Sequence, residues 1–284
     1  MICCETIVDI KQHVQAWKSQ QKTIAFVPTM GNLHQGHLSL VEKAKTLADK
    51  VVVSIFVNPM QFGAGEDLEN YPRTLTEDSE LLTDLNVDLL FLPNNGVMYP
   101  PNLGRSTEVF VPEISKTLCG QFRPDHFLGV TTVVNKLFNI VEANVAVFGE
   151  KDFQQVFIIK KMVDDLFMPI EIISSATVRE SDGLAMSSRN QYLSSEQRQQ
   201  AALIYQVLQE LKDLALAGSD LRQLESQGIE KLLVAGFKVD YVSFRSRKDL
   251  QPAKNNDREI VLLVAAWMGE TRLIDNLKLS LVKK

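Results

Sequence analysis

Two closely spaced histidines are the first candidates for chemistry. Residues 28–37 contain His34 and His37, two of the four histidines in the chain, in the pattern His-x-Gly-His. Side chains three residues apart at the start of a helix lie on one face, so both imidazoles can reach one anion. Each can donate a hydrogen bond to a phosphate oxygen or stabilise charge that develops in a transition state. Gly31 and Gly36 allow close approach of a ligand. This spacing predicts a phosphate-binding site.

Neutral polar side chains form a second candidate site. Asn58 and Gln61 directly follow residues 51–57, an apolar run typical of a strand that is buried on both faces. Amide groups can bind a small hydroxy acid without a full counter-charge. The alternative interpretation is a plain turn, because Asn-Pro favours turns.

A third candidate segment covers residues 149–155. Gly149 permits a tight turn, Lys151 could bind a phosphate, and Asp152 could hold ribose hydroxyls, as carboxylates do in other nucleotide sites. Gln155 lies one turn beyond. The alternative is a solvated helix N-terminus, where acidic residues are common.

A fourth candidate segment covers residues 186–190. The hydroxyls of Ser187 and Ser188, followed by Arg189, would make a compact phosphate-binding group, since Arg pairs with phosphate through two parallel hydrogen bonds. The alternative is a Ser-rich linker between domains.

Strands and helices alternate through the first 177 residues and would position these segments. Strands are predicted over residues 22–27, 51–57, 88–92, 145–148 and 171–177. Helices are predicted over residues 36–50, 74–86, 130–141 and 151–167, the second opened by a capping box of Thr74 and Glu77. This rhythm predicts an α/β, Rossmann-like parallel sheet with helices on both faces. Ligands of such sheets bind at the carboxyl ends of the strands, which is where the first three segments fall.

The pattern changes near residue 178. Ser194 and Gln197 predict a second capping box, with a helix to about Ala217 that stops at Gly218, and another helix over residues 220–235. Strands follow over residues 238–246, 259–268 and 271–277, the last two joined by a hairpin turn. We therefore expect two domains, a Rossmann-like domain over residues 1–177 and a smaller C-terminal α+β domain over residues 178–284.

Composition and net charge narrow the classes of binding partner that the protein is expected to have. The chain has 284 residues, a net charge of −5 and a pI of about 5.5, which disfavours nucleic acid because phosphate-backbone binding needs a surplus of Lys and Arg. Its three cysteines lack zinc-site spacing and fit a reducing compartment. No signal peptide is recognisable, and the longest strongly apolar run is too short to span a bilayer, which takes about 20 residues. These features predict a cytoplasmic protein without a membrane partner.

The motifs together resemble one family. His-x-Gly-His at a strand-to-helix junction resembles the nucleotidylyltransferase and class I aminoacyl-tRNA synthetase superfamily, and all four segments in this order resemble the pantothenate synthetase family. The resemblance extends to residues 54–57, 71–74, 123–127 and 129–130. It is close over about residues 20–192 and general in the C-terminal third. Asp125 departs from the family pattern Arg-Pro-Gly-His-Phe, which has glycine there.

The resemblance implies an ATP-dependent condensation of (R)-pantoate with β-alanine through a pantoyl adenylate, with release of AMP and pyrophosphate. It implies that His37 is an acid catalyst or charge stabiliser and that His34 lies beside it on the phosphates. Gln61 and Gln155 would hold pantoate, with Asn58 in support, and Gln61 would also orient β-alanine. The ATP-binding residues implied are Met30, Gly31, Asn32, Leu33, His34, Gln35, Gly36, His37, Gly149, Glu150, Lys151, Asp152, Val178, Met186, Ser187, Ser188 and Arg189.

The resemblance also implies Mg²⁺ between phosphate oxygens, where Glu77 and Asp78 could assist, although no protein ligand of the metal is assigned. It further implies a homodimer and a C-terminal domain that closes over the active site. ATP, pantoate and β-alanine are the expected small-molecule partners.

Two other functions fit the residues less well. A nucleotidylyltransferase that transfers AMP to a phosphate ester would need cationic groups for its acceptor, whereas Asn58, Gln61 and Gln155 are neutral. A nucleotide-binding regulatory or RNA-binding module without catalysis would not need the histidine pair together with Lys151 and Arg189, and it fits poorly with the acidic pI.

Overall fold

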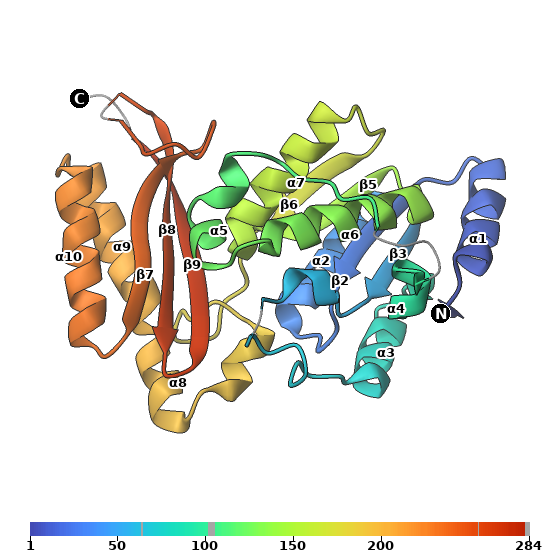
Figure 1. Ribbon diagram of the computed structural model, residues 1–284, viewed down its shortest axis with the longest axis horizontal. Helices are drawn as coiled ribbons and strands as arrows, with labels where there is room; N and C mark the ends of the chain where they lie inside the picture. The colour runs from blue at the N-terminus through green and yellow to red at the C-terminus, as the bar shows by residue number, and fades with distance from the viewer. Residues whose placement is uncertain (64, 102–105, 255, 282–284) are drawn as a thin grey trace. The chain divides into compact units, whose positions relative to one another are not determined.

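The computed structural model describes residues 1–63, 65–101, 106–254 and 256–281. The chain forms two compact units (Figure 1). The first consists of Met1–Glu150 with Gln154–Ala176, and the second of Lys151–Phe153 with Thr177–Lys284.

A six-stranded sheet forms the centre of the first unit, in the order β1-β4-β3-β2-β5-β6. Every pair of neighbouring strands is parallel, which confirms the predicted Rossmann-like class. The strands are β1 (Ile2–Cys4), β2 (Ile24–Thr29), β3 (Lys50–Ile55), β4 (Leu89–Phe91), β5 (Val145–Gly149) and β6 (Glu171–Ser175). Because β2 is bonded to both β3 and β5, the segments that follow these three strands emerge at the same edge of the sheet.

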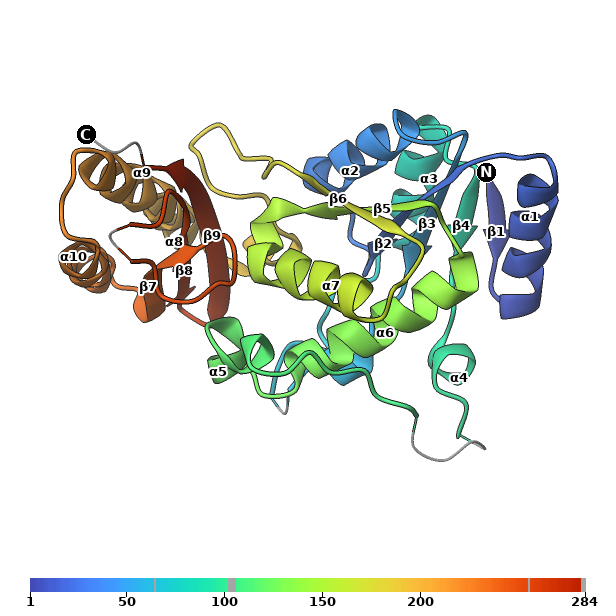
Figure 2. The same ribbon diagram turned by 90° about the horizontal axis from the view of Figure 1, so that it is seen from above.

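Helices cover both faces of this sheet. Ala25 and Val27 of β2 point into a core with residues of α2 and α3, whereas Phe26 points the other way and stacks edge-on against Phe138 of α6. Figure 2 shows α2 and α3 on one side of the strands and α6 and α7 on the other. The helices are α1 (Ile7–Ser19), α2 (Gln35–Lys45), α3 (Leu75–Asp84), α4 (Asn95–Met98), α5 (Cys119–Phe122), α6 (His126–Val141) and α7 (Phe153–Asp165), with 3₁₀ turns η1 (Pro59–Gln61), η3 (Ile114–Lys116) and η4 (Glu150–Asp152).

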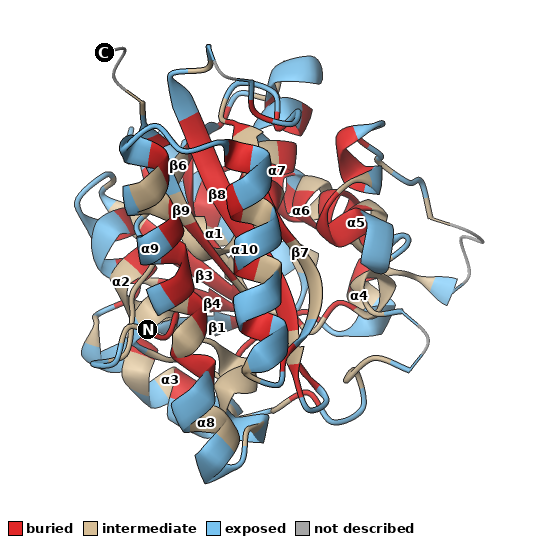
Figure 3. Cartoon of the chain, turned by 90° about the vertical axis from the view of Figure 1, so that its left-hand side faces the viewer, coloured by how far each residue is buried: buried red, intermediate tan, exposed pale blue. Residues whose placement is uncertain are grey.

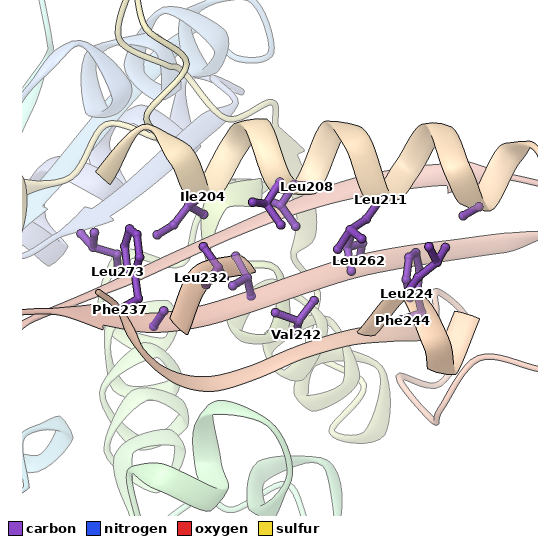
Figure 4. Packing of buried hydrophobic residues seen from close by; sticks show 14 of the residues in the cluster. Ile204, Leu208, Leu211, Leu224, Leu232, Phe237, Val242, Phe244, Leu262 and Leu273 are labelled. Atoms are coloured by element: carbon purple, nitrogen blue, oxygen red, sulfur yellow. The ribbon is translucent and has the colours of Figure 1, made fainter. Parts of the chain in front are cut away.

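The second unit is an antiparallel sheet, β7-β8-β9, packed against helices. Leu208 and Leu211 of α9, Leu224 and Leu232 of α10 and Leu262 of β8 belong to one buried hydrophobic cluster between the helices and the sheet (Figure 4). The outward sides of α9 and α10 are exposed (Figure 3). The elements are η5 (Ser188–Tyr192), α8 (Ser195–Ala201), α9 (Leu203–Leu216), α10 (Leu221–Val234), β7 (Lys238–Ser246), β8 (Glu259–Met268) and β9 (Thr271–Ser280).

One predicted capping box forms and the other does not. Ser194 and Gln197 form theirs at the start of α8. Thr74 precedes α3, but its side chain makes no capping bond, so this prediction was wrong. Its ψ of 47° lies outside the extended region from which a capping oxygen reaches the next turn. Within the described part of the chain its buried Oγ1 has no hydrogen-bond partner.

Other elements also differ from the predictions. The long helix expected after Ser194 is divided at Ala202 into α8 and α9, and it ends as expected before Gly218, which has φ +96°. Neither β1 nor α1 was predicted from the sequence, although α1 buries Ile10, Val14 and Trp17 at helical spacing. No helix in the described ranges is long and apolar enough to cross a membrane.

Candidate active site

The two histidines cap the start of α2. The backbone N–H of Gly36 donates to Nδ1 of His34 at 3.1 Å, and the backbone N–H of His34 donates to Nδ1 of His37 at 3.4 Å. The ring centroids lie 4.1 Å apart. Because each Nδ1 accepts a backbone N–H, a neutral ring carries its proton on Nε2. The pair therefore offers two Nε2–H donors at a helix N-terminus, where the helix dipole favours an anion.

A buried carboxylate fixes the loop between β2 and α2. Asp78 of α3 is 1% exposed, and its two oxygens accept the backbone N–H groups of Asn32 at 2.9 Å and Leu33 at 2.7 Å. Gly31 has φ +83°, and a Cβ there would lie 3.1 Å from Asp78 Oδ2 and 3.0 Å from Ile55 Cγ2. The left-handed backbone therefore favours glycine, and a Cβ would force Ile55 or Asp78 to shift by a few tenths of an ångström.

This role of Asp78 was not predicted from the sequence, which suggested the residue only as an aid to a metal. Because both carboxylate oxygens already accept backbone hydrogen bonds in a buried position, the geometry is that of a loop anchor. No local sequence signal identifies its partners, which lie 45 and 46 residues away. Among the residues that the structure describes, no group of three or more His, Cys, Asp or Glu side chains is arranged to hold a metal ion.

Asn58 supports Gln61 from below the surface. It is 1% exposed, and its Nδ2 donates to Gln61 Oε1 at 3.2 Å and to the carbonyl of Gly129 at 3.0 Å. Its Oδ1 accepts from Tyr99 Oη at 2.7 Å and from the backbone of Met60 at 3.3 Å. Because the NH₂ group and the oxygen of the Asn58 amide are both hydrogen-bonded within the protein, this side chain holds its neighbours in position.

Gln61 joins the second segment to the first. Its Nε2 donates to Met30 Sδ at 2.7 Å, within the loop that precedes the histidines. The turn that carries it rests tightly on α6, because a Cβ on Gly129 would lie 2.3 Å from the carbonyl oxygen of Met60. The structure therefore brings the first two predicted segments together.

A charged cluster holds the backbone of Gln61. His126 Nδ1 donates to the Gln61 carbonyl at 2.8 Å, and Arg123 Nη2 donates to the same oxygen at 3.3 Å. Arg123 also forms a bidentate pair with Glu66 and contacts His126 Nε2 at 3.2 Å. Burial raises the pKa of Glu66, but the hydrogen bonds and charge of Arg123 outweigh burial and hold that pKa below its usual range. From the sequence, this loop was predicted only as part of the family resemblance, without a role.

Asp125, which stands where the family pattern has glycine, has a left-handed backbone conformation. Asp125 precedes α6 with φ +64° and makes no side-chain capping bond. Glycine adopts this left-handed conformation without strain, and Asp tolerates it better than most residues.

The third segment starts at the carboxyl end of β5, beside β2. A Cβ on Gly149 would meet no described atom within 4 Å, so packing within the protein does not explain the glycine. Glu150 accepts a hydrogen bond from Ser174 Oγ at 2.9 Å. Gln155 is partly exposed on α7, while its neighbour Gln154 is buried and bonds the backbone of Cys119, Ile114 and Thr117. The sequence alone could not separate the roles of these two glutamines.

The remaining predicted residues lie in the second unit. Lys151 and Asp152 belong to η4. Val178 and Met186 are joined by a backbone bond of 3.0 Å at the base of a short hairpin. Beyond the hairpin, Ser187 Oγ accepts the backbone N–H of Arg189 at 3.2 Å and caps η5, which begins at Ser188. The Ser187 hydroxyl, which was predicted to bind phosphate, thus also shapes the loop.

Comparison with known proteins gives one consistent result. The sequence model of the family described as Pantoate-beta-alanine ligase matches residues 2–278. The pantothenate synthetase of Shewanella halifaxensis is 53% identical over 97% of this chain and 98% of its own length, and that of Idiomarina loihiensis is 54% identical over 94% and 95%.

Solved structures agree. The pantothenate synthetase of Thermus thermophilus superposes with a TM-score of 0.92 at 42% identity, covering 98% of this chain and 99% of that one. The pantoate-beta-alanine ligase of Francisella tularensis, solved with beta-gamma ATP and beta-alanine, gives a TM-score of 0.81 at 38% identity, covering 98% and 97%.

Proposed function

Since the chain belongs to the pantoate–β-alanine ligase family, we propose that it condenses (R)-pantoate with β-alanine by way of a pantoyl adenylate. The chain is a ligase of pantothenate biosynthesis, and it joins pantoate to β-alanine. The further proposal concerns the chemistry: ATP activates the acid, and AMP and pyrophosphate are released. A free carboxylate is a poor acyl donor, and its mixed anhydride with AMP supplies a good leaving group.

The capped histidine pair at the start of α2 is the observation that carries this proposal. In the first step a pantoate carboxylate oxygen attacks the α-phosphorus of ATP, a new P–O bond forms, and the bond to pyrophosphate breaks. Negative charge accumulates on the phosphate oxygens during this step. The Nε2–H groups of His34 and His37, with the N-terminus of α2, would stabilise that charge.

In the second step the unprotonated β-alanine amine attacks the acyl carbonyl carbon and forms the C–N bond of the amide. The bond from that carbon to the phosphate-bound oxygen breaks, AMP leaves with the former carboxylate oxygen, and the nitrogen loses one proton. The protein mainly has to hold the amine and the carbonyl in reacting geometry. We assign pantoate to Gln61 and Gln155, and Gln61 would also orient β-alanine. Asn58 contributes by fixing the Gln61 side chain.

We assign ATP to the residues for which the family resemblance implied that role, including Gly149, Lys151, Ser188 and Arg189. Mg²⁺ would arrive with the nucleotide and neutralise phosphate charge, since this ion is commonly held through phosphates and few protein ligands. Closure of the domain over residues 178–284, a homodimer and a cytoplasmic location are further parts of this proposal.

The test is an assay of pyrophosphate, AMP and pantothenate with ATP and Mg²⁺, omitting each substrate in turn. We expect pantothenate and free AMP only when pantoate and β-alanine are both present. Pantoate without β-alanine should release pyrophosphate in a burst no larger than the amount of enzyme, because the adenylate stays bound.

The variant His37→Ala should lose nearly all turnover, whereas His13→Ala, at the partly exposed His13 of α1, should retain it. Absence of pantoate-dependent pyrophosphate release from the wild-type protein would overturn the adenylate mechanism. Transfer of AMP to a phosphate ester would favour the nucleotidylyltransferase alternative instead.

A further inference from the structure

Two neighbouring residues of β9 hold two separate candidate segments of the nucleotide site. Asn276 Nδ2 donates to the backbone carbonyl of Lys151 at 3.0 Å. Asp275 accepts two hydrogen bonds from Arg179, from Nη1 at 2.6 Å and from Nη2 at 2.9 Å. Asp275 and Asn276 are only 3% and 5% exposed. The loop at Lys151 and the hairpin at Arg179 are therefore tied to adjacent positions of one strand.

Arg179 stabilises the hairpin that leads into residues 186–189. It pairs with Ala185 across the hairpin, and its Nη1 donates to the carbonyl of Gly183 at 3.0 Å. Its guanidinium lies 3.8 Å from the centroid of the Tyr205 ring. One side chain thus contacts β9, the far end of the hairpin and α9, which leaves the hairpin little freedom to shift.

The ion pair between Asp275 and Arg179 mainly fixes the orientation of the two side chains. Burial raises the pKa of the Asp275 carboxyl, while Arg179 and Lys151 oppose that shift. A buried ion pair often contributes little net stability compared with apolar packing, but its fork-to-fork geometry fixes orientation. Asp275 Oδ1 also accepts the backbone N–H of Asn276 at 2.7 Å, which links the two anchors.

We propose that Asp275 and Asn276 are positioning residues for the nucleotide. Asn276 sets the Lys151 backbone, and Asp275, through Arg179, sets the loop that carries Ser187, Ser188 and Arg189. Neither side chain is proposed to contact ATP. The phosphate-binding groups of two segments are thereby held at a fixed separation before ATP binds, which lowers the ordering cost of binding. This inference rests on the proposed function, because that function assigns both segments to ATP.

The test compares Asp275→Asn and Asn276→Ala with a matched control, Asp240→Asn. Asp240 is a similarly buried carboxylate in the same unit, which accepts from Arg272 Nε at 2.8 Å and from Trp267 Nε1 at 3.1 Å. Its partners lie in β8 and β9 and outside both candidate segments. All three variants should lower Tm. KM for ATP should rise about tenfold in Asp275→Asn and in Asn276→Ala and stay unchanged in Asp240→Asn. A tenfold change corresponds to about 1.4 kcal/mol, the size of one lost hydrogen bond.

KM for pantoate should not change in any of these variants, which separates nucleotide positioning from general damage. Arg179→Lys keeps the positive charge but loses the fork, and we expect it to resemble Asp275→Asn. Where turnover is too slow to measure, calorimetric titration with ATP gives the same comparison. If Asp275→Asn fails to fold because Arg179 loses its carboxylate partner, Asn276→Ala still tests the inference, since it leaves that ion pair intact.

The inference is overturned if ATP affinity in Asp275→Asn and Asn276→Ala matches Asp240→Asn, or if KM for all three substrates rises together. Its failure is distinct from failure of the proposed function, which would appear as absent pantoate-dependent pyrophosphate release in the wild-type protein.

Discussion

The carboxylate of Asp78 accepts the backbone N–H of Leu33 at 2.7 Å, across 45 residues of sequence. A second bond from the backbone N–H of Asn32 makes the contact bidentate. The shape of the loop in front of the histidine pair thus depends on a charge contributed by α3. Changes at Asp78 should therefore be visible in both stability and turnover.

Asp78→Asn keeps the size of the side chain but replaces one acceptor with an NH₂ group that faces a backbone N–H. We expect the free energy of unfolding to fall by about 1.5–3 kcal/mol, as for a lost hydrogen bond to a charged group. We expect kcat to fall too, since the histidines follow this loop. Chemical denaturation and steady-state kinetics check both, with Glu77→Gln, at the exposed neighbouring residue, as the control. Wild-type kinetics in Asp78→Asn would contradict the anchoring role.

Gly31→Ala tests the steric constraint on the same loop. A left-handed backbone costs an alanine about 1–2 kcal/mol, and the new Cβ would also press on Ile55 and Asp78. Gly65→Ala is a matched control, because Gly65 has the same φ of +83° but no described atom within 4 Å of a built Cβ. Both variants should lose stability in thermal unfolding, and only Gly31→Ala should also lose turnover. Equal turnover in the two variants would show that the contacts at Gly31 do not matter for activity.

Gly149→Ala should leave stability unchanged but weaken the binding of ATP. Because the added methyl meets no described protein atom within 4 Å, Tm should stay at the wild-type value. If the nucleotide lies against this backbone, the methyl group should raise KM for ATP severalfold without affecting KM for β-alanine. Steady-state kinetics with each substrate varied in turn would show this. An unchanged KM for ATP would remove Gly149 from the proposed nucleotide site.

Glu66 should make stability depend on pH in the acid range. Its pKa is held below the usual 4.5 in the folded protein, so its stabilising contribution is present above about pH 4.5 and is lost as the pH falls through the folded-state pKa. The Tm difference between wild type and Glu66→Gln should therefore be largest near neutral pH and shrink on acidification. Glu69→Gln, at an exposed residue of the same loop, is the control. A difference that grows toward low pH would contradict the pairing with Arg123.

Asp125→Gly tests the departure from the family pattern. Glycine relieves the strain of φ +64°, so the variant should be at least as stable as wild type, with a gain of up to about 1 kcal/mol. Asp125→Ala keeps a Cβ in the same conformation and should be the least stable of the three. Chemical denaturation gives the order, and a glycine variant less stable than the alanine variant would mean that the Asp side chain has a role of its own.

Much of the fold follows from local patterns in the sequence. The apolar run that became β3 and the alternating strands and helices predicted the parallel sheet, because backbone geometry imposes its period on the residues that must be buried. The His-x-Gly-His segment was recognised for the same reason, since a strand-to-helix junction is a local feature. Thr74 shows the limit of such patterns: the capping sequence is present, but the backbone entering α3 takes another conformation.

The sequence by itself therefore predicted most of the elements, the family and the residues expected to contact substrates, but not β1 or α1. Only the tertiary structure decided which side chains hold those residues in place. Asp78 meets its loop across 45 residues, Arg123 meets Glu66 across 57, and Arg179 meets Asp275 across 96. Such contacts arise when separate elements pack together, and no local periodicity records which distant groups will become neighbours.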